Sequence, residues 1–365
     1  MSAGLGPLIV WLARAHRGAL TPGWAVLSGA MIKAGILGMA LCLPLVPGAS
    51  AAERLGPVIG LVGLWTAFYG AAFGVFQANP KTVLAYSSLS QMGLIVAGLG
   101  LALCAPALAP AVLTAMTVYA VHHGLAKAAL FFAVGTVERA ASGTARRGAL
   151  LVAGLCALSI AGAPLTGGGF AKDLLKDAAA DGKAVWLGAL IYGALPFSAL
   201  ATALLLIRFL LRLTTKPAGR GAGGYLWAPF LVAALGAQVL PWLLGEPKAL
   251  TLSAAWASAW PLLLAMALGA AVVAGGRRHA AGQDRPRDLP TLPEGDLLAF
   301  IRVVPNPARL FDAETDKKEA TGTTVAPSVL DPMIAAGEAL ARDRLGAALL
   351  FIAAALALGV AVFAG

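Results

Sequence analysis

The stretch Val118-Tyr-Ala-Val-His-His-Gly-Leu-Ala-Lys-Ala-Ala-Leu-Phe-Phe-Ala-Val134 places two histidines and a lysine in an otherwise apolar segment. His123 and Lys127 are four residues apart, so they share one helix face, whereas His122 points about 100° away from His123. A lysine in the middle of a membrane span costs at least about 2.5–3.5 kcal/mol and usually faces a protein interior or a water path. The segment therefore predicts a membrane helix that handles protons or other ions.

The composition of the whole chain is that of an integral membrane protein. Of its 365 residues, 59% are hydrophobic and 12% are charged, and the mean hydropathy is +0.82. A soluble domain usually carries about 25% charged residues. The formal net charge of +10 would suggest nucleic-acid binding in a soluble protein. In a membrane protein it is explained first by the excess of Lys and Arg in cytoplasmic loops, so we expect no nucleic-acid partner.

Nine segments are apolar and long enough to cross a bilayer, for which about 20 residues are needed. The nine segments are 24–46, 55–77, 82–104, 110–136, 148–180, 184–213, 225–244, 254–275 and 346–364. We therefore expect an all-α fold with about nine transmembrane helices. Residues 1–13 are apolar but too short to cross and lack a signal-peptide pattern, so we expect the end of a helix whose beginning is missing.

Basic residues fall in every second connection between these segments. They are Arg14, Arg17, Lys81, Arg139, Arg146, Arg147, Arg208, Arg212, Lys216, Arg220, Arg277, Arg278, Arg285 and Arg287. The alternate connections are short and hold few charges. This alternation predicts that the Arg-rich side is cytoplasmic and that the chain lies in a bacterial inner membrane. The polar stretch 276–345 contains two amphipathic candidates, 296–304 and 328–345, for which we prefer a helix along the membrane surface over a disordered linker.

One apolar segment contains residues that interrupt a helix. Between Ser159 and Phe170 lie one proline and four glycines, at Gly162, Pro164 and 167–169. Unwound backbone at membrane depth survives only where protein or a water cavity shields it, and transporters use such broken helices at ion sites. A kink that serves packing alone is the alternative.

Two further lysines lie in or beside apolar segments. Lys33 lies mid-span and Lys172 follows the broken stretch. Burial disfavours the ammonium form, so a buried lysine can load and release a proton near neutral pH. Lys127 and His123 could exchange a proton directly or through one water. The alternatives are that Lys33 snorkels to the interface and that Lys172 is a loop cation paired with Asp173.

Other polar residues near these lysines have plainer interpretations. We interpret His122 as a packing or hydrogen-bonding residue, Lys81 as a cytoplasmic boundary residue, and Asp173, Lys176 and Asp177 as a solvated helix end. The three cysteines have neither metal nor redox spacing. We find no catalytic constellation, and the spans contain almost no carboxylates. We therefore expect neither a cofactor nor a metal site in this chain.

Several motifs together resemble the antiporter-like subunits shared by respiratory complex I, membrane-bound hydrogenases and Mrp-type cation/proton antiporters. Pro7-Leu-Ile-Val-Trp-Leu-Ala-Arg-Ala-His16 and Leu27-Ser-Gly-Ala-Met-Ile-Lys-Ala-Gly35 resemble the stretch that links the family's seventh and eighth helices. Lys81-Thr-Val-Leu-Ala-Tyr-Ser-Ser-Leu-Ser-Gln-Met-Gly93 is similar to its tenth-helix signature. His123-Gly-Leu-Ala-Lys-Ala-Ala-Leu-Phe131 and Gly169-Phe-Ala-Lys-Asp173 match its eleventh and broken twelfth helices. The resemblance covers about residues 5–215.

The resemblance implies roles for four residues of a proton pathway. Lys33 resembles the connecting lysine of the family's eighth helix. Lys127 resembles the central lysine of the eleventh helix, and His123 resembles the histidine that links to it. Lys172 resembles the lysine or glutamate of the twelfth helix at the exit half-channel. The family fold has two inverted five-helix repeats, each with one half-channel. By this resemblance 1–54 is a seventh-helix remnant plus an eighth-type helix, and 55–215 is the second repeat. Two extra helices at 216–275, a polar connector at 276–345 and a last helix at 346–365 follow.

The chain departs from the family pattern in three places. Asn79 stands where an aspartate is frequent, Tyr119 stands where some members have a histidine, and the first repeat is missing before Met1. We therefore expect either that a partner chain supplies the first repeat or that this copy does not conduct. The other partners implied are further membrane subunits, the lipid bilayer, and peripheral redox or uptake subunits.

The favoured function is a proton-translocating, antiporter-like subunit of a multi-subunit membrane complex. The alternatives are an Mrp-type sodium/proton antiporter or ion-coupled inorganic-carbon uptake subunit, and a non-conducting structural subunit. A weaker alternative is an enzyme subunit with substrate chemistry of its own. Three buried lysines argue against a purely structural role, because leucine in their place would be more stable.

Overall fold

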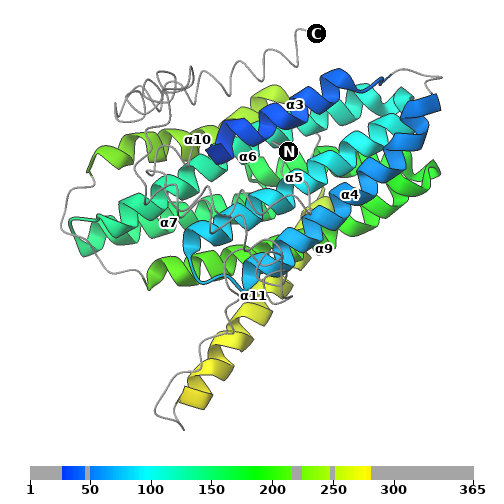
Figure 1. The fold of residues 1–365 in the computed structure, drawn as a ribbon. Coiled ribbons are helices and arrows are strands. Elements are labelled where there is room, and N and C mark those ends of the chain that lie inside the picture. Colours follow the sequence, from blue (N-terminus) through cyan, green and yellow to red (C-terminus); the bar gives the residue numbers. More distant parts are fainter. Residues whose placement is uncertain (1–26, 46–49, 216–223, 247–250, 281–365) are drawn as a thin grey trace, which may run out of the picture.

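The computed structural model describes residues 27–45, 50–215, 224–246 and 251–280 (Figure 1). The elements of these residues are helical. They are η1 (Leu27–Met31), α3 (Ile32–Cys42), α4 (Ser50–Val75), α5 (Pro80–Cys104), η2 (Pro106–Leu108), α6 (Ala109–Glu138), α7 (Gly143–Ala161), α8 (Gly167–Asp181), η3 (Gly182–Ala184), α9 (Trp186–Thr214), η4 (Gly224–Leu226), α10 (Trp227–Leu244) and α11 (Leu252–Ala280). Within the described ranges there is no strand, which confirms the all-α prediction.

Seven of the described helices are long and apolar enough to cross a membrane, and Ser28–Cys42 is a shorter apolar helix. The chain is therefore an integral membrane protein. The predicted span 346–364 and the amphipathic candidates 296–304 and 328–345 lie outside the described residues. Helix α11 continues through 276–280, which the sequence assigned to the polar connector. Helix α4 begins at Ser50, before the expected boundary at residue 55.

Helices α5 and α6 form the centre of the bundle. Nearly every residue of both helices is buried among the other helices. Helix α4 packs closely along α5, and the two run side by side in Figure 1. Glycines permit this approach, because a Cβ on Gly63 would lie 2.5 Å from the backbone nitrogen of Ala97. The two histidines and Lys127 of α6 therefore lie inside protein and away from lipid.

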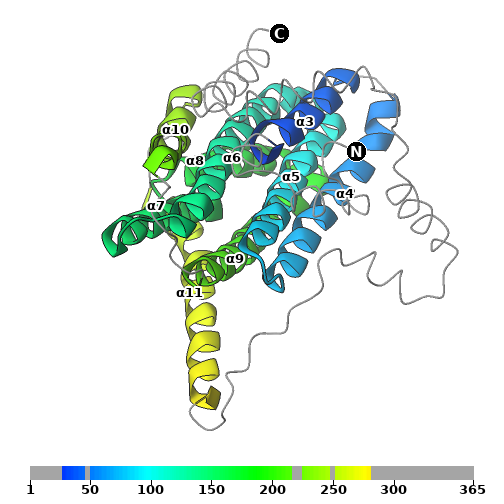
Figure 2. The same ribbon diagram turned by 60° about the vertical axis from the view of Figure 1, so that its left-hand side comes forward.

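Helix α11 leaves the bundle. Figures 1 and 2 show its C-terminal half projecting away from the other helices, and its apolar residues are largely exposed. The helix contacts α9, where Gly269 lies beside Ile207. An apolar surface of this kind suits contact with lipid or with another membrane protein.

Two of the arginine-rich connections meet at one end of the described bundle. Arg146 donates to the backbone oxygen of Thr214 at 2.7 Å, and Arg139 donates to the Tyr225 hydroxyl at 3.4 Å. The connection after α6 therefore meets the connection between α9 and α10. This arrangement agrees with the alternation of charge in the sequence.

The predicted span 148–180 is two helices with an unwound segment between them. Helix α7 ends at Ala161, and Gly162 takes a left-handed conformation with φ of 96°. Leu165 also has a positive φ, of 64°, which is costly for a residue with a side chain. Helix α8 then begins at Gly167, where the Thr166 hydroxyl accepts a hydrogen bond from the Gly169 nitrogen. The interruption is thus a full break of the helix and not a kink.

Candidate functional site

Lys127 and His123 lie one helical turn apart on the most buried part of α6, and both are 0% exposed. The Lys127 Nζ donates a hydrogen bond of 2.8 Å to the backbone oxygen of Leu84 on α5. Neither ring nitrogen of His123 has a hydrogen-bond partner among the described residues. Lys127 and His123 are therefore not hydrogen-bonded to each other. Of the two routes for proton exchange that the sequence allowed, direct transfer and transfer through one water, this geometry leaves the second.

Lys33 lies at the start of α3 and is 2% exposed. Its Nζ donates to the backbone oxygen of Ser28 in η1, a π-helical turn. Helix α6 allows η1 to lie this close because residue 124 is glycine: a Cβ there would lie 2.9 Å from the Gly29 oxygen. The side chain of Lys33 thus points into the protein and does not reach toward an exposed surface of the described chain.

Two serines connect the surroundings of Lys33 and Lys127. The Ser28 and Ser88 hydroxyl oxygens are 2.7 Å apart, and Ser88 donates to the Leu84 oxygen at 3.1 Å. Since Ser88 uses its single hydrogen for Leu84, Ser28 must be the donor between the two hydroxyls. Ser88 and Lys127 therefore share one acceptor, and a row of polar groups from Ser28 and Ser88 lies between the two lysines.

Lys172 lies on α8 and is 9% exposed. Its Nζ donates at 3.0 Å to the backbone oxygen of Ala161, the last residue of α7, and its stem lies against Gly162. The broken helix thus supplies a free carbonyl for the lysine, because the last carbonyls of a helix lack intrahelical partners. Lys172 makes no ion pair with Asp173, which instead accepts from the Ser258 hydroxyl of α11 at 3.3 Å.

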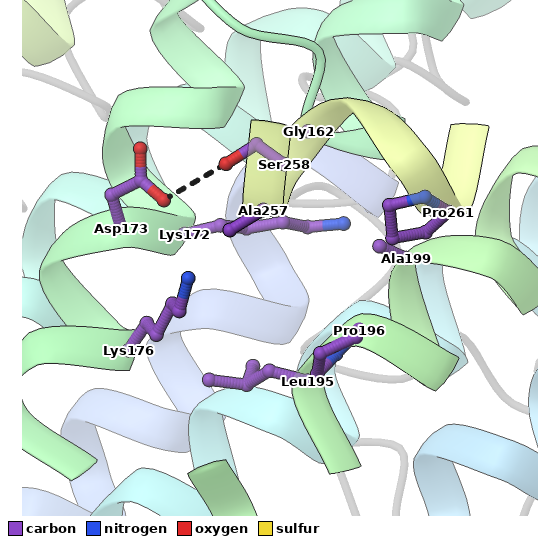
Figure 3. A pocket seen from close by; sticks show the side chains of 10 residues that line it. All are labelled: Gly162, Lys172, Asp173, Lys176, Leu195, Pro196, Ala199, Ala257, Ser258 and Pro261. Carbon is purple, nitrogen blue, oxygen red and sulfur yellow. Dashed lines mark hydrogen bonds between the residues drawn. The ribbon is translucent and has the colours of Figure 1, made fainter. Parts of the chain in front are cut away.

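The described structure has a cavity beside Lys172, shown in Figure 3. Residues from α8, α9 and α11 line it together with Gly162, and they include Lys172, Lys176, Pro196 and Ser258. Its volume of about 40 Å³ is enough for at least one water. In Figure 3 the amine of Lys176 points toward the Lys172 side chain. The cavity therefore offers water a place next to the lysine of the broken helix.

The charges of the buried lysines act on the central histidines. His123 is within electrostatic range of Lys33, Lys127 and Lys172, and also of His122. Lys33 acts in the same way on Lys127. Like charges in a low-dielectric interior repel strongly. The fold therefore brings Lys33, Lys127 and Lys172, which the sequence spreads over three segments, around His123.

The remaining candidates lie around this group. Lys81 is half-buried at the start of α5, where Asn79 caps the helix by accepting from the Lys81 nitrogen at 3.0 Å. Lys176 is half-buried beside the ring of Tyr192. Tyr119 is buried and donates to Gln91, whose amide nitrogen donates to Thr202 on α9 at 2.8 Å. Lys81 thus lies at the first turn of α5, at one end of the bundle, and Tyr119 lies in the buried centre of the bundle.

The sequence did not single out five residues that complete the site. They are Ser28, Ser88, Ser159, Gln91 and Gln238. His122 is bound by one of them, since its Nε2 lies 2.9 Å from the Ser159 hydroxyl of α7. The sequence signal that could have identified these residues is a polar side chain within an apolar span. The signal is weak, because a serine in a helix usually hydrogen-bonds to the backbone of its own helix. Among the described residues, no group of three His, Cys, Asp or Glu could hold a metal.

Comparison with known proteins gives a consistent family. Residues 1–196 match the model of the family described as NADH:quinone oxidoreductase/Mrp antiporter, TM. The chain is 35% identical over 140 residues to formate hydrogenlyase subunit 3 of Escherichia coli, and 35% identical over 130 residues to NADH-quinone oxidoreductase subunit M of Pseudomonas aeruginosa. These alignments cover 37% and 35% of this chain, and only 23% and 24% of the two relatives.

Two further similarities concern cation/proton antiporters. A probable K(+)/H(+) antiporter protein of Rhizobium meliloti is 34% identical over 180 residues, which is 46% of this chain and 17% of that protein. A chain of the solved Mrp complex from Dietzia sp. has a TM-score of 0.53 and 25% identity. That match covers 94% of this chain and 39% of the other. The chain thus spans well under half the length of the proteins that it resembles.

Proposed function

The chain belongs to the NADH:quinone oxidoreductase/Mrp antiporter transmembrane family, and we propose that it translocates protons as an antiporter-like subunit of a multi-subunit membrane complex. The observation that carries the proposal is the burial of Lys33, Lys127, His123 and Lys172 in the bundle interior. Three buried lysines lower the stability of the fold, because an apolar residue at each position would pack without the cost of burying a charge. A role for their charge in proton transfer explains why they are there.

The proposed path has an outer and an inner section. Water in the cavity between α8, α9 and α11 exchanges protons with Lys172. The proton then passes the histidines of α6 to Lys127, and a water must enter between His123 and Lys127, because neither His123 ring nitrogen has a hydrogen-bond partner among the described residues. Between Lys127 and Lys33 lie the hydroxyls of Ser88 and Ser28, and water must bridge each lysine to them, because both lysines donate to backbone carbonyls. This is one half-channel, and the remaining half requires groups beyond those described.

Charge repulsion couples the steps of this path. A proton on Lys33 raises the free-energy cost of a proton on Lys127, since the two ammonium groups would lie close together with little water between them. A charge that arrives at one lysine therefore drives the proton off its neighbour. A partner that moves charge near Lys33 could drive transport by this means.

Partners and orientation follow from the same considerations. The exposed apolar faces of α10 and α11 are available for lipid or for further membrane subunits. We place the arginine-rich end in the cytoplasm of a bacterial inner membrane, by the excess of Lys and Arg on that side. A partner that carries the family's first repeat would supply the other half-channel.

A cation/proton antiporter is the second candidate, favoured by the coverage of 94% of this chain by the Mrp complex chain. In that case sodium or potassium would cross through a partner or through groups outside the described residues. Transport assays with proton, sodium and potassium gradients separate the two candidates, because only the second requires a counter-cation for proton movement.

The test is proton flux in proteoliposomes that contain the full chain within its native complex. Lys127→Ala should reduce the proton flux about 100-fold, the effect expected when a proton-transfer group is lost. Lys183→Ala is the control, because Lys183 is exposed and packs on the Tyr192 ring away from the buried group. A Lys127→Ala complex that moves protons at the wild-type rate would refute the proposal.

A further inference from the structure

The first turn of α8 is held by side chains from two other helices. The first backbone N–H groups of any helix lack intrahelical partners. Here the Gly167 nitrogen donates to the Gln238 Oε1 of α10 at 3.2 Å, and the Gly168 nitrogen donates to the Ser159 Oγ of α7 at 3.1 Å. The Ser159 and Gln238 oxygens are themselves 3.2 Å apart. Three helices thus meet at the break through a small hydrogen-bond network.

The backbone fixes the orientation of one side chain in this network. A backbone N–H can only donate, so the Gln238 atom that faces Gly167 must be its oxygen. Ser159 has one hydrogen, and both this oxygen at 3.2 Å and the His122 Nε2 at 2.9 Å lie within hydrogen-bond distance of its hydroxyl. When that hydrogen goes to Gln238, the Ser159 oxygen accepts from Gly168 and from the His122 Nε2, which then carries a hydrogen.

This assignment fixes the chemistry of the His122 ring. With its hydrogen on Nε2, a neutral ring keeps its lone pair on Nδ1, which is buried and has no hydrogen-bond partner within the described ranges. The ring packs against Gly168, where a Cβ would lie 2.6 Å from the His122 Cε1. Lys172 is four residues after Gly168 and so lies on the same face of α8 as the glycine that packs on the His122 ring.

We infer that Gln238 is a positioning residue that sets the tautomer of His122 and so makes its Nδ1 the atom that exchanges protons with Lys172. In this exchange an N–H bond of the lysine ammonium breaks and an N–H bond forms at Nδ1. The neutral amine and the imidazolium remain, and the Nε2 hydrogen stays directed at Ser159. The functional part of the inference rests on the proposed proton path. Gln238 lies outside residues 1–196, which match the family.

The experiment observes the tautomer directly. The full chain in its complex is labelled with ¹⁵N-histidine, and the imidazole nitrogens are recorded by solid-state NMR. The chain has four histidines, so a His122→Asn sample assigns the signal. The wild-type His122 should carry hydrogen on Nε2 and none on Nδ1 at neutral pH. A wild-type ring with its hydrogen on Nδ1 would overturn the inference, whatever the transport assay shows.

A pair of variants tests the role of Gln238. In Gln238→Met, Ser159 loses its acceptor and is free to donate to His122 Nε2, so the hydrogen should move to Nδ1. Val239→Met introduces the same side chain at an exposed neighbouring position and should leave the tautomer unchanged. Ser159→Ala, which removes the partner of Nε2, should also abolish the preference. An unchanged tautomer in both Gln238→Met and Ser159→Ala would overturn the positioning role.

Proton flux in the same samples tests the functional part. Gln238→Met should slow the flux about two- to tenfold, the effect of one lost hydrogen bond, while Val239→Met should match the wild type. A tautomer that shifts without any change in flux would refute the exchange with Lys172. If the wild-type complex moves no protons, the proposed function fails, and the NMR result still decides the assignment of the tautomer.

Discussion

The hydroxyl oxygens of Ser28 and Ser88 lie 2.7 Å apart and join the surroundings of Lys33 to those of Lys127. Lys33 donates to the backbone of Ser28, and Lys127 shares the Leu84 oxygen with Ser88. The two lysines are 94 positions apart in sequence, counted from 33 to 127. The link therefore exists only because η1 packs between α5 and α6.

Removal of the Ser88 hydroxyl should interrupt this link. We expect Ser88→Ala to lower proton flux about two- to tenfold, because a hydrogen bond between the lysines is lost. Ser87→Ala is a matched control, since the Ser87 hydroxyl is also buried but has no hydrogen-bond partner among the described residues. The proton flux of the double variant Ser28→Ala/Ser88→Ala should equal that of the more impaired single variant, because both serines act in one link. Additive losses in the reconstituted complex would show separate roles.

The close approach of η1 to α6 should depend on Gly124. A Cβ at this position would lie 2.9 Å from the Gly29 oxygen, so Gly124→Ala should push η1 outward and destabilise the protein by about 1–3 kcal/mol. Gly154→Ala on α7 should be neutral or slightly stabilising, because its Cβ position has no described atom within 4 Å apart from its own stretch of helix backbone. Thermal unfolding of the detergent-solubilised protein compares the two. Equal melting temperatures would contradict the proposed packing constraint.

The cavity beside Lys172 should be needed for proton exchange. Ala257→Leu on α11 would fill it, because Ala257 is one of its lining residues. We expect proton flux to fall while the melting temperature stays close to that of the wild type. Ala270→Leu on the same helix, away from this cavity, should have no effect on flux. Normal flux through the Ala257→Leu complex would mean that water reaches Lys172 by another route.

The bond between Tyr119 and Gln91 should contribute to stability through a fully buried network. In Gln91→Leu the Tyr119 hydroxyl loses its acceptor at a site with 1% exposure, and we expect a loss of about 1–3 kcal/mol. Adding Tyr119→Phe should recover part of this loss, since the unpaired hydroxyl is then removed. A double-mutant cycle on chemical denaturation measures the coupling. A coupling energy near zero would contradict a shared hydrogen bond.

Much of the fold could be predicted from local sequence features. The break within 148–180 was marked by Gly162, Pro164 and the three glycines that follow, because these residue types interrupt a helix wherever it packs. The membrane helices followed from the length of the apolar runs. In contrast, the apolar pattern gave no sign that α11 projects from the bundle, since lipid and protein interior favour the same side chains.

By itself, the sequence determined that Lys33 and Lys127 lie in apolar helices, that Lys172 follows a helix break, and that His123 shares a face with Lys127, because residue types and helical periodicity alone dictate these relations. Only the tertiary structure decided their partners: Leu84 for Lys127, Ala161 for Lys172, and the serine link to Lys33. Backbone carbonyls and serine hydroxyls occur throughout every helix. Which of them meets a given lysine depends on how the helices cross, and residues far apart in the chain set those crossings.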